Sequence, residues 1–136
     1  MPVHTEMIKL KTKPNQFYEL TDKVKGIIKS SELFSGLCIV FCPGSTGAVI
    51  LNENDPMLLK DLKDVLENVA SQKNFWTHTD NAYSHIRATL LGPSVSVPIE
   101  EGRATLGQWQ SVLFYEADTK ARDREIIVTI VGEYEE

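Results

Sequence analysis

The chain has 136 residues, enough for one domain that buries a core without disulfide or metal support. Its formal net charge of -5 argues against a general nucleic-acid binder, because neutralising phosphates requires a basic surface. No apolar run approaches the roughly 20 residues that cross a bilayer, and the first residues lack the apolar segment of a signal peptide. We therefore expect a cytoplasmic protein with no membrane contact.

Residues 3–13 alternate as a strand, and a slip in phase at Met7 and Ile8 predicts a bulge there. Residues 13–32 change to the period of a helix, with Asn15 as the expected N-cap. The apolar stripe of this helix consists of Phe17, Leu20, Val24, Ile27 and Ile28.

Residues 35–44 form a continuous apolar run bounded by glycines, which predicts a buried strand. Residues 47–54 are expected to be its hairpin partner, because Pro43, Gly44 and Gly47 supply turn residues between them. Cys38 and Cys42 lie roughly 13 Å apart along the strand, too far for a mutual disulfide, so we expect two buried thiols.

Residues 54–72 predict the clearest helix, capped by Asp55 or Asn54 and with Pro56 in its first turn. Its expected buried face is Leu58, Leu59, Leu62, Val65, Leu66 and Val69. A short helix follows, with Asp80 or Asn81 as the cap and Gly92 after its last turn. We expect its apolar face to carry Ala82, Ile86 and Leu90.

Residues 94–107 predict two strands around a turn that contains Gly102. Residues 109–118 and 124–135 predict two more, and the β-branched second of these suits the centre of a sheet. Trp109 is expected in the core, with Gln108 and Gln110 on the opposite, polar face of its strand. Because strands outnumber helices and most connections are short, residues 1–136 are predicted to form one antiparallel α+β domain.

Two of the three histidines, His78 and His85, fall within residues 75–94 near the start of the short helix. Six residues separate them, which is not a metal-binding motif by itself. Spacing alone leaves two interpretations open, a functional site or ordinary hydrogen-bonded histidines near a helix end.

Residues 44–47 read Gly-Ser-Thr-Gly between two apolar runs. Small residues with hydroxyls let backbone N–H groups approach an anion, although a plain turn explains the same residues. Glu53 falls where a strand ends beside a helix N-terminus. The charged turn at 118–125 contains Arg122 and Arg124, and one of them could reach a phosphate.

Residues 80–118, taken in order, resemble the YjbQ-like family, often called secondary thiamine-phosphate synthase enzymes. That family has an N-x-x-x-H turn, an LLG-S step, a VP strand and an LG-x-WQ segment. The residues that fit are Asn81, His85, Leu90, Leu91, Gly92, Ser94, Pro98, Gly102, Leu106, Gly107, Trp109, Gln110 and Glu116. The resemblance extends over nearly the whole chain, from about Thr5 to Gly132.

The resemblance implies an antiparallel, sandwich-like α+β fold with two main helices and one short helix, in a homotrimer whose pockets lie near subunit interfaces. It implies a weak coupling of a pyrimidine pyrophosphate to a thiazole phosphate. Many members carry a histidine, taken as a metal ligand, where this chain has Gly44, which resembles a G-S-T variant branch. The third metal ligand must then come from Glu53, Asp80, Cys42 or a neighbouring subunit.

Our first hypothesis is therefore an enzyme acting on a small phosphorylated metabolite. Its expected catalytic residues are His85, Glu53 and Asp80, and its expected metal ligands are His78 and His85. The divalent metal is expected to be zinc, or magnesium brought by a pyrophosphate substrate. The residues expected to bind substrate phosphate are Ser45, Thr46, Asn81, Arg87 and Gln110.

The alternative hypothesis is a non-catalytic protein that keeps the pocket and binds a phosphorylated metabolite or a metal. Gly44 in place of histidine supports it. A third hypothesis, a structural or partner-binding subunit with the acidic tail "EYEE", has no specific motif. Residues 37–42 and 124–132 carry more apolar surface than two helices cover, so we expect a homotrimer.

Overall fold

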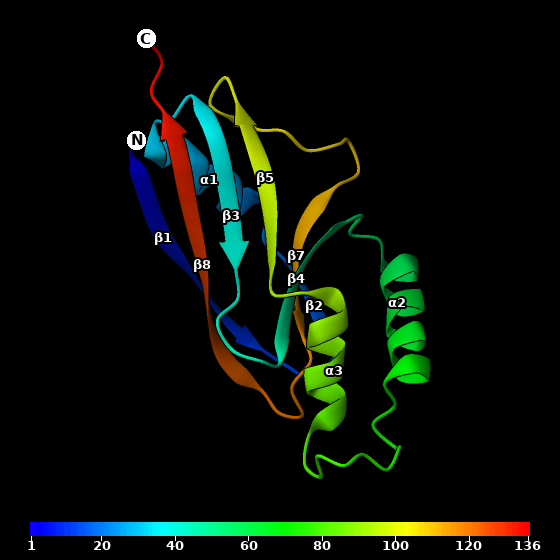
Figure 1. The fold of residues 1–136 in the computed structure, drawn as a ribbon. Helices are drawn as coiled ribbons and strands as arrows, with labels where there is room; N and C mark the ends of the chain where they lie inside the picture. The colour runs from blue at the N-terminus through cyan, green and yellow to red at the C-terminus, as the bar shows by residue number, and fades with distance from the viewer.

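Two antiparallel β-sheets and three helices make up the computed structural model, which describes residues 1–136 (Figure 1). The five-stranded sheet contains, in spatial order, β1 (Val3–Thr12), β8 (Arg122–Glu133), β3 (Ser35–Phe41), β5 (Ser94–Glu100) and β6 (Arg103–Ala104). The three-stranded sheet contains β2 (Gln16–Glu19), β7 (Ser111–Glu116) and β4 (Gly47–Asn52). The helices are α1 (Thr21–Ser31), α2 (Pro56–Val69) and α3 (Ala82–Leu91). The predicted antiparallel α+β fold with two main helices and one shorter one is confirmed.

β1 pairs with β8 without interruption, from Val3 opposite Val131 to Thr12 opposite Arg122. The predicted bulge is therefore wrong. Val3 and Met7 lie on the outer face of the sheet and are exposed, whereas Ile8 faces the core. Both faces of this strand carry apolar residues, and this produced the apparent slip in phase.

The segment predicted to begin the first helix is instead strand β2, in which Phe17 lies opposite Tyr115 of β7. Their rings pack with centroids 4.7 Å apart. Asn15 does not cap the helix: it has a φ of 59°, and its side-chain oxygen accepts a 2.7 Å hydrogen bond from the Tyr115 hydroxyl. Pairing with β7 thus overrides the local helical period, and the helix begins only at Thr21.

β3 and β4 are not a hairpin. β3 lies between β8 and β5, while β4 pairs with β7 in the other sheet. The chain passes from one sheet to the other through residues 42–46. The strand predicted to be buried is buried on one face only: Cys38 and Val40 face the core, whereas Leu37 and Phe41 are exposed on the outer face.

The core lies between the sheets and is closed by α1. Leu20 at the N-cap position, and Val24 and Ile28 within the helix, are buried with residues of β3, β7 and β8. Cys38 and Cys42 are both free and buried, which confirms the prediction for the thiols. Burial raises the pKa of the Cys38 thiol to about 11.

α2 begins as predicted, because the Asp55 carboxylate accepts a 2.9 Å hydrogen bond from the Leu58 N–H. Its predicted buried face is wrong, since Leu66 is its one buried residue. Val65 and Val69 are 55% and 57% exposed. α2 stands beside the sandwich rather than across a sheet (Figure 1), so most of its apolar stripe has no cover within one chain.

α3 occupies the predicted span, with Asn81 at the N-cap position and Gly92 at φ 94° after it. The predicted apolar face is only partly right, because Leu90 is exposed while Ser84, Arg87 and Ala88 are buried. α3 lies alongside β4, whose small residues allow close approach.

The predicted hairpin of β5 and β6 and the predicted strands β7 and β8 are confirmed. Trp109 is a correction, since it is 68% exposed in the loop before β7. Gln110 lies in the same loop, where its side-chain oxygen accepts a 2.8 Å hydrogen bond from the Gly107 N–H. None of the helices has the length and apolar character needed to cross a membrane.

Candidate functional site

His78 and His85 lie together, as residues that flank the start of α3. Their ring centroids are 5.2 Å apart and the rings meet edge to face, at 87°. His78 belongs to the segment between α2 and α3, and His85 is the fourth residue of α3. The short helix and the loop before it therefore place two imidazoles side by side.

The pair opens onto a cavity of about 370 Å³, here called the histidine pocket. The pocket is lined by Trp76, Thr77, His78, Ala82, His85 and Ile86. Half of these residues are hydrophobic, so the pocket offers apolar contact beside the imidazole nitrogens. This mixture is typical of sites for small organic ligands.

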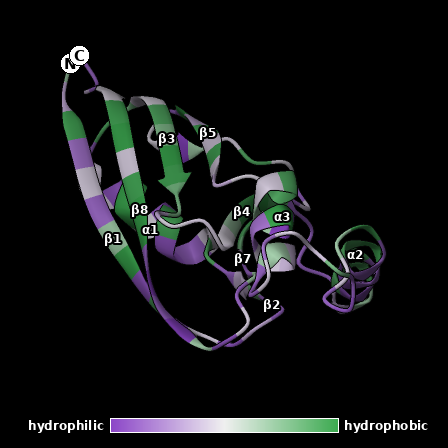
Figure 2. Cartoon of the chain, turned by 60° about the horizontal axis from the view of Figure 1, so that its bottom comes forward, coloured by the Kyte–Doolittle hydropathy of each residue, from purple (hydrophilic) through white to green (hydrophobic).

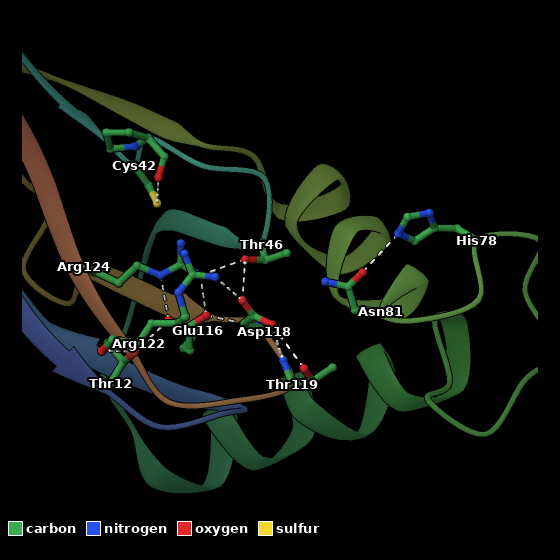
Figure 3. A network of polar contacts seen from close by, with 11 residues as sticks. Thr12, Cys42, Thr46, His78, Asn81, Glu116, Asp118, Thr119, Arg122 and Arg124 are labelled. Carbon is green, nitrogen blue, oxygen red and sulfur yellow. Dashed lines mark hydrogen bonds and ion pairs between the residues drawn. The ribbon is translucent and has the colours of Figure 1, made fainter.

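Hydrogen bonds orient the loop side of the histidine pocket. The side-chain oxygen of Asn81 lies 3.1 Å from Nε2 of His78 (Figure 3). Because an amide oxygen only accepts, His78 donates from Nε2 and its Nδ1 is left as an acceptor. The indole N–H of Trp76 donates to the Ser71 carbonyl at 2.9 Å and ties the loop to the end of α2.

The donor set in one chain does not fit a catalytic metal. No third histidine, cysteine, aspartate or glutamate joins His78 and His85 in a group that could hold an ion. The expected additional ligands Glu53, Asp80 and Cys42 are not brought to the pair. Catalytic zinc uses three protein ligands, so two imidazoles fall short.

A second polar cluster, the buried ion-pair network, lies where β7 ends and β8 begins (Figure 3). Glu116 is fully buried and accepts two hydrogen bonds from Arg124, at 2.7 and 2.6 Å. The Thr12 hydroxyl and the Asp118 N–H also donate to this carboxylate, at 2.7 and 3.0 Å. Hydrogen bonding to Glu116 raises the pKa of Arg124 above its usual value, which keeps the guanidinium charged.

Thr46 belongs to this network. Its hydroxyl donates to Asp118 at 3.2 Å and accepts from Arg124 at 2.9 Å. Asp118 also pairs with Arg122, at 2.5 Å. Burial opposes ionisation of Asp118, but bonds from the Thr119 N–H, Arg122 and Thr46 outweigh it and lower the pKa of the carboxyl.

The loop before Thr46 leaves Arg124 open on one side. Gly44 has a φ of 109°, and a Cβ placed there would lie 3.1 Å from Nη1 of Arg124. That nitrogen has no hydrogen-bond partner, whereas Nε and Nη2 are both used. Ser45, the next residue, is exposed. Glycine at position 44 therefore leaves the space beside this nitrogen free of a side-chain carbon.

The structure separates the other residues predicted for the site. Arg87 does not line the histidine pocket; its guanidinium donates to the Ala70 carbonyl, the Tyr115 hydroxyl and Glu67. Glu53 and Gln110 adjoin the paired residues Asn52 and Ser111, at the opposite end of β4 from Thr46. The length of β4 separates them from Thr46 by roughly 20 Å. Asp80 is exposed and forms no side-chain hydrogen bond.

The family model for "UPF0047 protein YjbQ-like" matches residues 6–133. The chain belongs to this family. A UPF0047 protein of Methanothermobacter thermautotrophicus is 38% identical over 97% of this chain and 94% of its own. A solved structure of a hypothetical protein from Aeropyrum pernix superposes with a TM-score of 0.89 at 32% identity, covering 95% of this chain and 98% of that one. An uncharacterised YjbQ/UPF0047 protein of Clostridium acetobutylicum gives a TM-score of 0.88 at 35% identity, with 93% and 99% covered.

The sequence marked Thr46, Arg122 and Arg124 as candidates to bind a phosphate, but it did not predict that they join a buried ion-pair network. The other members of that network are Thr12, Glu116 and Asp118. One signal was available, because Arg124 has the same strand parity as the buried residues Ile126 and Val128. A charge in phase with core positions requires a buried counter-charge, and Glu116, at the end of a strand buried along its length, meets that need.

Proposed function

We propose that the chain is an enzyme acting on a small phosphorylated metabolite, with the histidine pocket as its reaction centre. The observation that carries this is the pair of imidazoles, 5.2 Å apart at the wall of an open, half-apolar pocket. Imidazole exchanges protons near neutral pH, and a positioned pair can donate to one substrate atom while accepting from another.

The two histidines take different parts in this proposal. Asn81 holds His78 with Nδ1 as the acceptor, which suits a general base. His85 is fixed in helix α3 and reaches the same pocket, so it serves as the proton donor. Asp80 is exposed next to this segment and contributes negative charge near the imidazoles rather than a direct contact.

The substrate phosphate is proposed to bind at the loop formed by Gly44, Ser45 and Thr46. The free Nη1 of Arg124 and the exposed Ser45 hydroxyl are the donors there. Both neutral and charge-assisted hydrogen-bond donors are common in phosphate-binding sites. Arg87, Glu53 and Gln110 have no part in the proposed phosphate site, because they lie in other parts of the structure.

The specific reaction proposed is the one implied by the resemblance, coupling of a pyrimidine pyrophosphate to a thiazole phosphate. A bond forms between the thiazole nitrogen and the pyrimidine methylene carbon, while the carbon–oxygen bond to pyrophosphate breaks and pyrophosphate leaves. The pocket's apolar residues would contact the rings, and the imidazoles would hydrogen-bond polar ring atoms or the leaving group.

The test compares His85→Ala with His4→Ala in an assay for the coupled product. His4 lies on β1 and hydrogen-bonds Glu6, so its loss controls for removing a histidine elsewhere. We expect His85→Ala to lower kcat by about 100-fold or more, and His4→Ala to stay within about twofold of the unchanged protein. Equal activity in the two variants would remove His85 from the mechanism.

A second candidate is a protein that binds the phosphorylated metabolite without turning it over. The absence of a third ligand beside the histidine pair and the presence of Gly44 favour it. It predicts that pyrimidine and thiazole phosphates raise the unfolding temperature while no product forms. Product formation that depends on His85 decides against it.

A bound zinc or magnesium ion requires at least one further ligand, supplied by another copy of the chain. We propose this as the route to a metal site and derive no chemical step through it. Elemental analysis of tag-free protein, compared with the His85→Ala variant, tests it. Equal, near-zero metal in the two samples contradicts a metal held by the histidine pair.

We also propose a homotrimer, with the outer face of the five-stranded sheet as the contact between copies. Val3, Val131 and Leu37 form one apolar row across this face, and Met7, Ile127 and Phe41 form another. Figure 2 shows hydrophobic residues along β3 and parts of β8, where no helix covers the outer face. Light scattering tests the proposal: the mass of a monomer at micromolar concentration contradicts it.

A further inference from the structure

A second cavity, here called the Arg87 cavity, lies between helices α2 and α3 and has a volume of about 390 Å³. Its wall includes Lys63 and Glu67 of α2, Lys73 of the following loop, and Tyr83 and Arg87 of α3. The volume is within the range of small-molecule sites. It shares no lining residue with the histidine pocket.

Most residues that line the Arg87 cavity are polar or charged, and only 2 of the 11 are hydrophobic. The histidine pocket, by contrast, has 3 hydrophobic residues among 6. A ligand for the Arg87 cavity must therefore be compact and polar, without a large ring or chain to bury. This chemistry differs from that proposed for the histidine pocket.

The lining residues carry three cations and three carboxylates, so the local balance of charge depends on how the carboxylates are paired. Each of its three carboxylates already has a cation: Glu67 pairs with Arg87, Asp64 with Lys60 and Asp118 with Arg122. Lys63 and Lys73, in contrast, form no ion pair. The two lysine charges are therefore uncompensated, which favours an anionic ligand.

Arg87 gives the cavity a rigid donor. It is 3% exposed, and its guanidinium is held by Glu67 at 2.7 Å, the Tyr115 hydroxyl at 3.2 Å and the Ala70 carbonyl at 3.0 Å. The Tyr83 ring lies 5.0 Å from the guanidinium carbon. These contacts use three of the five N–H groups of an arginine, so one N–H on each terminal nitrogen has no acceptor in the protein. A group held in this way loses little conformational entropy on binding.

Another basic hollow of the chain lacks such a donor. It is formed by Lys25 and Lys29 of α1 and Arg103 of β6, and all three side chains are exposed. It has similar charge but no buried cation, so it serves as a comparison rather than as a competing site.

We propose that the Arg87 cavity is a binding site for a compact dianion, a phosphate monoester or a dicarboxylate, held by Lys63, Lys73 and Arg87. The two lysines neutralise the ligand's charge from the rim, and Arg87 hydrogen-bonds it from the wall. The site is separate from the proposed reaction centre and goes beyond the proposed function.

Isothermal titration calorimetry of the full chain, with inorganic phosphate and then malonate as probes, tests the proposal. Concentrations up to about 10 mM detect a Kd in the millimolar range. We expect at least one probe to bind, and the one that binds tighter identifies the ligand as phosphate-like or dicarboxylate-like. No binding of either probe overturns the proposal.

Variants then locate the bound anion. Lys63→Gln with Lys73→Gln should weaken binding by about tenfold or more, because both uncompensated charges are lost. Lys25→Gln with Lys29→Gln changes the net charge equally and should leave binding within about twofold. Equal weakening in the two double variants overturns the proposal, since it shows an effect of net charge alone. Lys25, Lys29 and Lys73 are exposed and Lys63 is half-buried without an ion pair, so both variants are expected to fold.

His85→Ala separates this site from the proposed reaction centre. Phosphate or malonate binding should stay within about twofold in this variant, even though catalysis is expected to fail. Binding that disappears in His85→Ala but persists in the Lys63 and Lys73 double variant places the anion in the histidine pocket and overturns the proposal.

Discussion

Replacing Arg124 by Met should be among the most destabilising changes in this protein. Arg124 is almost fully buried and gives two charge-assisted hydrogen bonds to Glu116, at 2.7 and 2.6 Å. Methionine fills much of the same space but leaves the Glu116 carboxylate buried with only Thr12 and a backbone N–H as donors. Removing one partner of a buried ion pair costs about 3–5 kcal/mol, and we expect a loss in this range.

The double replacement Arg124→Met with Glu116→Leu distinguishes the energy of the ion pair from the effect of changed side-chain packing. Because it removes both charges together, we expect it to be clearly more stable than Arg124→Met alone. Urea unfolding followed by circular dichroism gives the free energies, provided that the m-values stay unchanged. Arg103→Met, at an exposed arginine, is the control and should change stability by less than about 0.5 kcal/mol.

Two results would refute this reasoning. The first is an Arg124→Met variant no less stable than Arg103→Met, which would mean that the Glu116 carboxylate finds other donors or takes up a proton at little cost. The second is a double variant whose loss equals the sum of the two single losses, because residues in one ion pair must show a coupling energy.

Three further predictions concern stability. Glu67 and Asp118 have lowered pKa values in the folded chain. Their contribution to the free energy of unfolding is therefore complete above the unfolded-state pKa values of about 4 and is lost as the pH falls below them. Urea midpoints should drop between about pH 5 and pH 3, and a flat profile contradicts this. Gly44→Ala should lower the free energy of unfolding by about 1–2 kcal/mol, because Gly44 has a φ of 109° and lies next to Arg124. Gly26→Ala, in open space within α1, should instead raise it by up to about 1 kcal/mol. Similar effects at both sites would exclude backbone strain at Gly44 as the cause. Asp55→Ala removes the N-cap of α2 and should cost about 1 kcal/mol in thermal or urea unfolding, whereas an unchanged midpoint would show that α2 contributes nothing to global stability.

The resemblance to the family and the strand-rich fold class followed from local signals. Long β-branched runs such as β8 and the turn at Gly102 predict an antiparallel sheet, and both were confirmed. The cap of α2 at Asp55 was also predicted, because it requires only residues adjacent in the chain.

Predictions that depended on distant partners were less successful. Phe17 fitted a helical stripe, yet its packing against Tyr115 places it in a strand. Residues 47–54 were predicted to pair with β3 because they follow it closely in the chain. In the structure, β3 instead pairs with β8 and β5. Trp109 was expected inside because tryptophan often is, but its loop lies outside the sandwich.

Candidate site residues such as the two histidines and Asn81 stand out in the sequence alone, because spacing and capping are local properties of the chain. Only the tertiary structure decided which of them meet. It brought the rings of His78 and His85 to a centroid distance of 5.2 Å and placed Arg124 against Glu116. It also placed Arg87 in the wall of a separate cavity. The physical reason is that a buried charge needs a counter-charge, and a buried backbone N–H or C=O group needs a hydrogen-bond partner. These partners can come from any part of the chain.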